Sequence, residues 1–311
     1  MKKALKVIAA AALCLSLSAC GSAPGSENAN TLHYTYKNES IEVKAAPQRI
    51  VALSAPLLNM VYAVGGTSVG RPATTSPIPP EAENLPQIGH VQNINVEQLI
   101  ALKPDLVIGE KSQSRKLENL MESNHIPHIF INYDGINDNV PLIEFLGRIY
   151  GTEKKAEALI QKYQTDLKDI EGKAAAQKTP ARIAVLRATG KSVTAETPQS
   201  ICASMTELLK MDNVITAHKE LSLQDKTVPY SLEQLAADDP DIIFIVTMGK
   251  VDAINKKLNE EMRSNPAWNH LRAVQDNRVY FLPNDLFLMN PGLRTPEALE
   301  QLYNLAYGGQ G

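Results

Sequence analysis

The apolar residues between positions 152 and 177 recur with the spacing of an α-helix rather than that of a strand. They fall on one helical face: Ala156, Leu159, Ile160, Tyr163, Leu167 and Ile170. Lysine and glutamate residues occupy the other face, many of them three or four positions apart, as on a solvated helix. At ~1.5 Å per residue this helix is roughly 35 Å long, which is the width of a small domain. The stretch therefore predicts a rigid helix that joins two larger units.

Short apolar stretches alternate with amphipathic helices on both sides of this helix. Before it, a hairpin is expected at 31–43 and strands near 50–53, 67–71, 105–109 and 129–132. After it, strands are expected near 182–187, 241–246 and 278–282. Strands separated by helices predict parallel sheets that bind ligands at the carboxyl ends of the strands. We therefore expect an α/β fold of two doubly wound parallel-sheet lobes, residues 31–150 and 179–311, joined by one long helix at 151–178.

The first 30 residues have the layout of an export signal followed by a tether. Three lysines lie within the first six residues, and positions 7–17 form a short apolar run. The run ends in Leu-Ser-Ala before Cys20, which resembles the box at which bacterial lipoproteins are cleaved and acylated. We expect a signal peptide at 1–19, acyl chains on Cys20 and a tether at 20–30, so that the chain is anchored to the lipid bilayer at the extracytoplasmic face of the cell membrane. An ordinary signal peptide with an accidental cysteine is the alternative.

Composition and charge narrow the classes of function. The 311-residue chain is 44% hydrophobic, which is enough for two cores. Its net charge of −3 becomes about −6 without the three N-terminal lysines. The sequence contains no basic patch, so we do not expect nucleic acid as a partner. The sequence has no GxSxG, HExxH, P-loop or strand-linked GxGxxG motif, so we expect no enzyme. Its histidines and carboxylates do not cluster as in a zinc or manganese receptor.

Four segments in order resemble the class III substrate-binding proteins of ABC importers. They are PQRIVALS, which ends at Ser54, NVEQLIALKPDLVIG from Asn95, SLEQLAADDPDIIFIV from Ser231, and NPAWNHLRAVQDNRVYFLP, which ends at Pro283. That family carries ferric siderophores, haem and vitamin B12, and its members hold the ligand between two lobes joined by one helix. The resemblance implies a monomeric binding protein that delivers its ligand to an ABC permease and its ATPase.

Within the family, the chain is most similar to the haem-binding lipoproteins of Gram-positive iron-regulated surface systems. The shared pieces are the RIV..S.....M stretch that ends at Met60, the TAET segment at Thr194–Thr197 and a stretch that ends at Leu299. Such relatives hold haem iron by a methionine of the first lobe and a histidine of the second. Met60 matches the methionine, and Met248 stands at the histidine position. The resemblance therefore implies either haem as the transported ligand, bound by two methionines, or a ligand that is a ferric siderophore or a corrinoid.

The sequence pattern around Met60 differs from that around Met248, and it bears differently on a role as an iron ligand. Two neutral thioethers favour ferrous haem iron and do not titrate, unlike a histidine ligand. Met60 keeps helical spacing with Leu57 and Val64, so a core position is its alternative. Met248 directly follows a strand and precedes Gly249, where a doubly wound sheet presents ligand contacts.

Further cleft contacts follow from the same resemblance. His90 lies in a loop that borders the cleft in the family, which makes it the substitute axial ligand. Tyr133 ends an expected strand and is a candidate phenolate ligand to ferric haem. Met289 lies in a loop that approaches the cleft and would pack on the macrocycle or supply another thioether. Haem propionates need cations or backbone donors, and the candidates at strand ends and in the final loop are Arg71, Arg187 and Arg294. A surface or packing role is the alternative for each of these residues.

Docking to the permease uses one acidic residue on each lobe of these proteins. Glu207 matches the acid of the second lobe, but Asn59 stands where the first lobe usually has a glutamate. Asn59 cannot form an ion pair, so either Glu81 or Glu83 replaces it or the docking contacts are unequal. An acid on an exposed helix face is otherwise unremarkable.

Overall fold

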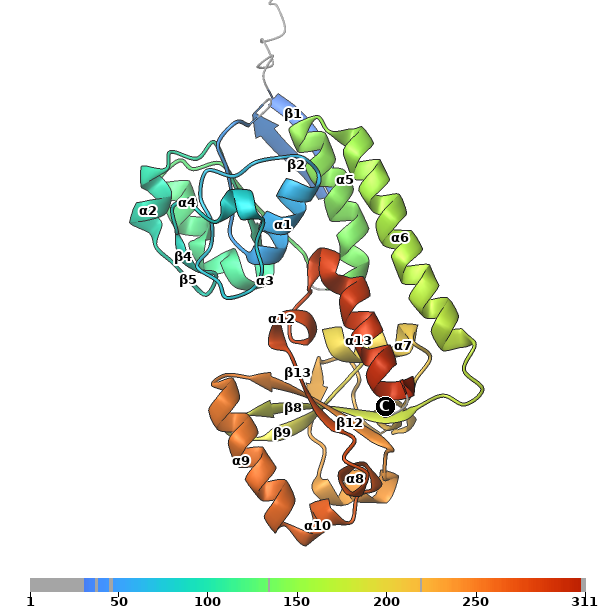
Figure 1. Ribbon diagram of the computed structural model, residues 1–311. Helices are drawn as coiled ribbons and strands as arrows, with labels where there is room; N and C mark the ends of the chain where they lie inside the picture. Colours follow the sequence, from blue (N-terminus) through green and yellow to red (C-terminus); the bar gives the residue numbers. More distant parts are fainter. Residues whose placement is uncertain (1–30, 37–38, 45–46, 134, 219, 309–311) are drawn as a thin grey trace, which may run out of the picture.

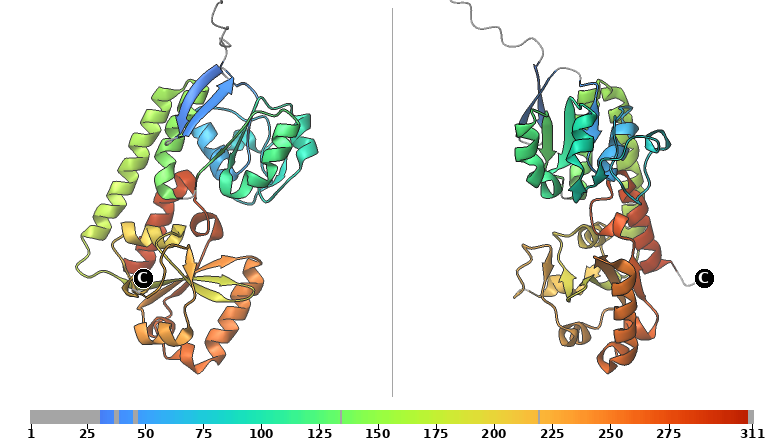
Figure 2. Two further views of the ribbon diagram at one scale, coloured as in Figure 1. Left: turned by 180° about the vertical axis from the view of Figure 1, so that it is seen from behind. Right: turned by 90° about the vertical axis from the view of Figure 1, so that its left-hand side faces the viewer.

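Two α/β lobes lie one above the other in the computed structural model, and one long helix runs along the edge of both (Figure 1). The structure describes residues 31–36, 39–44, 47–133, 135–218 and 220–308. The expected signal peptide, Cys20 and tether lie outside these residues. The view from behind shows the same arrangement of the lobes and the helix (Figure 2). The predicted fold class, with parallel-sheet content and a long helix, is confirmed.

The first lobe contains a hairpin, a parallel sheet and covering helices. The hairpin joins β1 (Thr31–Tyr36) to β2 (Glu39–Lys44), and the sheet has the order β3 (Ile50–Ala52), β6 (Leu106–Glu110), β7 (His128–Ile131). Its helices are α1 (Ala55–Ala63), α2 (Val96–Ala101), α3 (Lys111–Ser114), α4 (Glu118–Ser123) and α5 (Asn139–Tyr150). A second short hairpin joins β4 (Gly89–His90) to β5 (Asn93–Ile94). One core lies between the sheet and α1 with α5, and another between the sheet and α2 with α4.

The second lobe is built on a mixed sheet. The strands follow the order β11 (Thr227–Val228), β9 (Val193–Glu196), β8 (Arg182–Thr189), β12 (Ile242–Met248), β13 (Val279–Leu282), and β10 (Asp212–Asn213) also pairs with β8. Its helices are α7 (Ile201–Leu208), α8 (Leu232–Asp238), α9 (Val251–Ser264), α10 (Pro266–Asn269), α11 (Arg272–Gln275), α12 (Asn284–Phe287) and α13 (Thr295–Tyr307). Strand β12 is almost wholly apolar because helices cover both faces of the sheet. Successive residues alternate between two cores, with Phe244 on the side of α7 and α13 and Ile245 on the side of α8 and α9.

Two sequence expectations about strands are wrong. Residues 67–71 form no strand, and only an isolated bridge joins Arg71 to Gln87. The Ser68 hydroxyl instead donates to the carbonyl oxygens of Ile50 and Gly70. The segment makes one backbone hydrogen bond to β3, from Val69 N–H to the Ile50 oxygen, and then turns away from the sheet. The second sheet is also not purely parallel, because β9 pairs antiparallel with both β8 and β11. A tight turn between β8 and β9 returns the chain directly, so no crossover helix is present there.

The long helix α6 (Glu153–Ala175) confirms the prediction from hydrophobic spacing. Gly151 has a φ of +63° and ends α5 in the left-handed conformation, which reverses the chain into α6. Ala156, Tyr163 and Ile170 are buried on the predicted face, whereas most of the charged residues are exposed. Helix α6 packs on α5 of the first lobe and on α13 of the second. It therefore contributes to the packing of both lobes.

The two lobes exchange apolar side chains near their junction. Ile136 precedes α5 in the first lobe, but it packs in the core around α7 and α13. Leu293 precedes α13 in the second lobe, but it packs against the core of the first lobe. The segment around Leu293 also contacts α1. The junction consequently has its own packed core in addition to α6.

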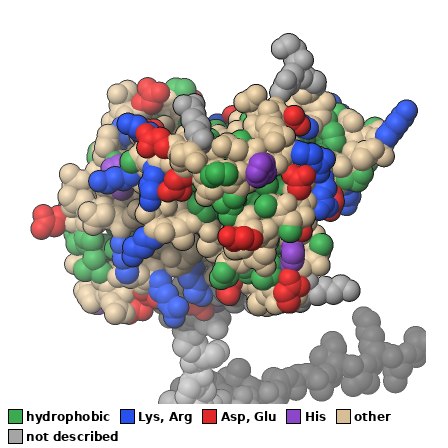
Figure 3. Space-filling model, turned by 90° about the horizontal axis from the view of Figure 1, so that it is seen from below, with side chains coloured by type: hydrophobic (Ala, Val, Ile, Leu, Met, Phe, Trp, Pro, Cys, Tyr) green, Lys and Arg blue, Asp and Glu red, His purple; other side chains and the backbone are tan. Residues whose placement is uncertain are grey.

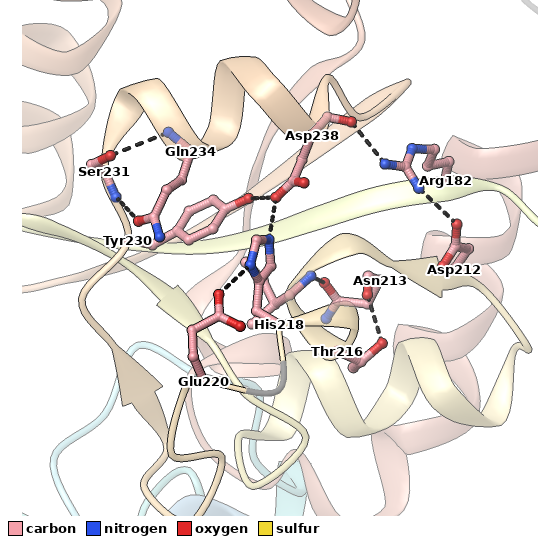
Figure 4. A network of polar contacts seen from close by, with 11 residues as sticks. Arg182, Asp212, Asn213, Thr216, His218, Glu220, Tyr230, Ser231, Gln234 and Asp238 are labelled. Atoms are coloured by element: carbon pink, nitrogen blue, oxygen red, sulfur yellow. Dashed lines mark hydrogen bonds and ion pairs between the residues drawn. The ribbon is translucent and has the colours of Figure 1, made fainter.

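A polar network holds the lower part of the second lobe together (Figure 4). The Asp238 carboxylate lies 2.6 Å from His218 Nε2, and the Tyr230 hydroxyl donates to the same Asp238 oxygen. Glu220 Oε1 lies 2.7 Å from His218 Nδ1. Arg182 donates to the backbone oxygen of Asp238 at 2.9 Å. The network ties the loop before β11 to helix α8.

Seen from below, acidic and basic side chains are mixed across the molecular surface (Figure 3).

Candidate functional site

A cavity of about 300 Å³ lies between the two lobes. The first lobe supplies the start of α1 from Ser54, the loop at 72–76 and the hairpin at His90, and the second lobe supplies residues around Asn284 and Met289. Small-molecule sites span roughly 300–1,000 Å³, so this volume is at the small end of the range. The carboxyl ends of β3 and β13 lead into the cavity walls, as the alternation of strands and helices predicts.

A buried carboxylate lies behind the first-lobe wall of this cavity, where it is bound by Ser54 of the lining. Glu110 ends β6 and is only 6% exposed, and Ser54 Oγ donates to its Oε1 at 2.7 Å. Gln113 Nε2 donates to Glu110 Oε2 at 2.7 Å and also lies 3.6 Å from Met289 Sδ. Ser54 and Gln113 are therefore the side chains through which this carboxylate is connected to the cavity. The opposite wall holds the Oδ1 of Asn284, which is buried and has no hydrogen-bond partner among the described residues.

Met60 is fully buried in this conformation and does not line the cavity. It lies on α1, and its Sδ is 4.0 Å from the hydroxyl of Tyr133, which is 3% exposed. A Cβ added to Gly292 would lie 3.4 Å from Met60 Cε and 3.2 Å from the Tyr133 hydroxyl. The segment of the second lobe around Gly292 therefore covers Met60. Gly292 has a φ of +63°, and the absence of a side chain permits both this conformation and the close approach.

Tyr133 is a hydrogen-bonded phenol rather than an open ligand. Its hydroxyl donates to Asn139 Oδ1 at 2.5 Å. Burial, followed by the charge of Glu110, raises the pKa of Tyr133 well above its usual value. The side chain therefore stays protonated at neutral pH, and the phenolate role expected from the sequence requires this burial to be relieved.

Met248 is accessible, unlike Met60. It is the last residue of β12 and is 49% exposed. The preceding Thr247 donates to Asn255 of α9 at 2.5 Å, so Met248 projects from the opposite face of the sheet. That face carries α12 and lies toward the first lobe in Figure 1. Met289 is 38% exposed and lines the interlobe cavity together with His90.

The three arginines predicted to bind acidic groups all have protein partners. Arg71 donates to the backbone oxygens of Glu83 and Pro72. Arg187 places Nε and Nη2 at 2.7 and 2.6 Å from a single oxygen of the buried Glu196. Arg294 binds Glu297 with two nitrogens and Asp285 with a third, and these acids raise its pKa. Each guanidinium is therefore already satisfied by protein oxygens.

The charge of Arg187 partly offsets the cost of burying the Glu196 carboxylate inside the second lobe. Burial raises the pKa of Glu196, and the Arg187 charge opposes that shift. Glu196 Oε2 has no hydrogen-bond partner among the described residues. Releasing Arg187 to a ligand would leave this carboxylate buried without its cation, which is costly.

The residues expected to contact the permease lie on the outside of the lobes. Glu207 is exposed on α7. Asn59 is half-buried on α1 and donates to the backbone oxygen of Pro77 at 3.0 Å, so it holds the proline-rich loop. Glu81 and Glu83 are both exposed on that loop. The first lobe therefore presents two exposed acids on the loop that Asn59 holds.

Sequence reasoning missed two polar residues at the junction, Glu110 and Asn139. Glu110 directly follows the apolar run Leu-Val-Ile-Gly. A carboxylate at the end of a buried strand is typical of a ligand-binding edge, so the sequence could have identified this residue. Asn139 is completely buried and contacts residues 24 and 156 positions further along the chain. Nothing in the local pattern marks it, because its partners are brought together only by folding.

The described residues have two further properties. No helix among them has the length and apolar character to cross a bilayer. They also contain no group of three or more His, Cys, Asp or Glu side chains arranged to hold a metal ion.

Comparisons with known proteins agree with the sequence resemblance. A family model for periplasmic binding proteins matches residues 50–286. The high-affinity heme uptake system protein IsdE of Staphylococcus aureus strain Newman is 25% identical over 264 residues, which cover 85% of this chain and 89% of the relative.

Solved structures show the same fold. An ABC transporter substrate-binding protein from Listeria monocytogenes EGD-e has a TM-score of 0.73 and 25% identity, over 84% of this chain and 99% of that chain. S. aureus IsdE complexed with heme has a TM-score of 0.71 and 24% identity, over 83% of this chain and 98% of that chain. FeuA from Bacillus subtilis complexed with ferri-bacillibactin has a TM-score of 0.67 and 19% identity, over 87% and 97% of the two chains. The chain thus belongs to the periplasmic binding protein family, and it is a substrate-binding protein of an ABC importer rather than an enzyme.

Proposed function

We propose that this protein captures haem between its lobes and delivers it to an ABC permease driven by its ATPase. In this proposal it acts as a monomer, anchored through acylated Cys20 to the extracytoplasmic face of the membrane. The observation that carries the proposal is the set of donors around the cleft. Met289 and His90 line the interlobe cavity, and the exposed Met248 projects from the sheet face that lies toward the first lobe. Thioether and imidazole groups are the neutral side chains that ligate haem iron in proteins.

Met60 and Met248 are the proposed axial ligands, one from each lobe. Met248 is exposed already, whereas Met60 is covered by the second-lobe segment around Gly292. A modest separation of the lobes that withdraws this segment would uncover Met60 and widen the cavity of about 300 Å³ for a macrocycle. His90 is the alternative donor, because it is exposed at the cavity without any movement.

The relative IsdE supports haem as the cargo, because its name describes heme uptake and the similarity covers most of both chains. Each lobe also presents an exposed acid for permease contact, with Glu207 on the second lobe and Glu81 or Glu83 on the first. In this proposal Asn59 does not contact the permease through an ion pair, because its amide holds the loop at Pro77. The docking contacts are then displaced toward the proline-rich loop.

The deciding experiment is a visible titration of residues 30–311 with haem, first oxidised and then reduced with dithionite. A stoichiometric Soret shift with sharp low-spin bands after reduction is expected for two strong axial ligands. Absence of a saturable shift would overturn haem as the cargo and favour a ferric siderophore or a corrinoid. The anchor has a separate test, because incorporation of labelled palmitate in cells should disappear in Cys20→Ser.

A further inference from the structure

Two turns meet at the carboxyl edge of the second sheet, beside Met248. Met248 pairs with Thr189 in the ladder between β12 and β8. The residues that follow these two positions, Gly249–Lys250 and Gly190–Lys191, form walls of a cavity of about 520 Å³. Helix α9 closes another side through residues such as Ile254. The cavity therefore lies on the α9 face at the rim of the second lobe, and Met248 projects from the opposite face at the same edge of the sheet.

Lysine side chains bring positive charge to this rim, and two of them are unpaired in the described part of the chain. Lys191, Lys250 and Lys257 line the cavity, and Glu261 is the acid among its lining residues. Lys257 lies 3.7 Å from Glu261, so that pair is largely neutralised. In the described part of the chain, the ammonium groups of Lys191 and Lys250 have neither a hydrogen bond nor an ion pair. This distinguishes them from the three arginines, whose guanidinium groups are all bound to protein oxygens.

The backbone at this rim adds to the positive character. Helix α9 is 14 residues long and begins after Lys250 without a side-chain cap, so its first N–H groups lack an acceptor from the cap residue. Gly249 has a φ of +127°, a conformation that glycine alone adopts readily, and this turn places Lys250 at the start of α9. Asp252 lies in the first turn of α9, but it does not line the cavity.

We infer that Lys191 and Lys250 bind the carboxylate groups of the cargo at this rim. The inference rests on the proposed function, in which an iron-bearing macrocycle meets Met248. A flat ligand centred there would extend its acidic side chains over the edge of the sheet, toward the two turns. Lysine carries its charge on a flexible four-carbon stem, so it reaches such a group without movement of the backbone. The two lysines then select an acidic tetrapyrrole over a neutral one.

The test compares haem with haem dimethyl ester, in which both propionates are neutral. Purified full-length protein is titrated with each ligand, as wild type and as Lys191→Met and Lys250→Met. Each substitution is expected to weaken haem binding by roughly tenfold, as for loss of a charge-assisted hydrogen bond, and to leave ester binding unchanged. The Soret maximum should stay the same, because the axial ligands are untouched. Lys256→Met is the matched control, since Lys256 is exposed on α9 and does not line the cavity.

Each outcome has a definite meaning. Restoration of haem affinity by Lys191→Arg and Lys250→Arg supports a role of the positive charge. Wild-type affinity for haem in both methionine variants, or equal losses for haem and its ester, overturns the lysine assignment while haem binding stands. Failure of the wild-type protein to bind haem overturns the proposed function, and the lysine assignment falls with it.

Discussion

The side-chain nitrogen of Asn139 lies 3.0 Å from the hydroxyl oxygen of Thr295, which begins the last helix of the second lobe. The same nitrogen donates to the Tyr163 hydroxyl of α6 at 2.7 Å and to the backbone oxygen of Gly292 at 3.1 Å. Its amide oxygen accepts from Tyr133. One completely buried side chain therefore connects the first lobe, the long helix and the second lobe.

Removal of this connection should destabilise the whole molecule. Asn139→Ala leaves the hydroxyl groups of Tyr163 and Thr295 without one of their buried partners, and Tyr133 without its acceptor. We expect the free energy of unfolding to fall by about 2–3 kcal/mol, as for buried polar groups that lose their partners. Urea denaturation followed by circular dichroism measures this change. Asn119→Ala on the exposed surface of α4 is the control, and an equally small effect of both substitutions would contradict a central role of Asn139.

Two glycines with the same backbone conformation permit a matched comparison. Gly151 and Gly292 both have a φ of +63°, but a Cβ added to Gly151 meets nothing within 4 Å. Gly151→Ala should therefore show the cost of the left-handed conformation alone, about 1 kcal/mol. Gly292→Ala should cost about 1–3 kcal/mol more, because its Cβ would lie 3.2 Å from the Tyr133 hydroxyl, which is closer than ordinary van der Waals contact. Thermal unfolding of both variants tests the difference. Equal losses of stability would show that the segment at Gly292 does not pack tightly against Tyr133.

The two exposed methionines should contribute differently to haem binding. Met248→Ala removes a proposed axial ligand, whereas Met289→Ala removes a side chain that lines the interlobe cavity and contacts Gln113. We expect Met248→Ala to weaken haem binding at least tenfold and to abolish the low-spin bands, and Met289→Ala to change affinity by less than threefold. Visible titrations of the reduced proteins report both quantities. Identical, negligible changes in the two spectra would eliminate the assignment of two methionine ligands.

The network at His218 should make stability depend on pH. The hydrogen bond with Asp238, followed by that with Glu220, raises the pKa of His218 above 6.5 in the folded protein. Because the folded protein holds this proton more tightly than the unfolded chain, the stabilisation is complete below about pH 6.5 and is lost as the pH rises through the folded pKa.

The measurement is the melting temperature of wild type and His218→Gln between pH 5.5 and 9. At pH 5.5 the wild type should melt about 2–4 °C higher than the variant, because roughly 1 kcal/mol of unfolding free energy corresponds to a shift of this size. This advantage should shrink toward pH 9. His270→Gln changes an exposed histidine of the same lobe and is the control. A difference between wild type and His218→Gln that does not vary with pH would refute the role of the proton.

Most elements of the fold were predictable from local patterns. Helix α6 was evident because residues such as Ala156, Tyr163 and Ile170 repeat at helical spacing on an otherwise charged segment. The buried strand β12 was evident because its run of β-branched and aromatic residues is continuous. The expected strand at 67–71 failed because a single side chain, Ser68, satisfies backbone groups that a neighbouring strand would otherwise bind.

The site was predictable only in part. The sequence identified the edge of the sheet at Met248 and the loops at His90 and Met289, because strand ends and family motifs are local features. It could not show that Arg187 is already paired, because its acidic partner, Glu196, lies nine positions away in another strand. Whether a charged side chain is free depends on which neighbours the fold brings to it.

The sequence by itself determined the order of strands and helices, the long connecting helix and the membership in a family of two-lobed binding proteins. These properties follow from hydrophobic period and from short motifs, which are written in contiguous residues. The tertiary structure alone decided that Met60 is covered while Met248 is exposed, and that Asn139 joins the two lobes. Burial and hydrogen bonding at these positions depend on segments more than 100 residues apart in the chain, such as Gly292 against Met60, and only their packing brings such segments into contact.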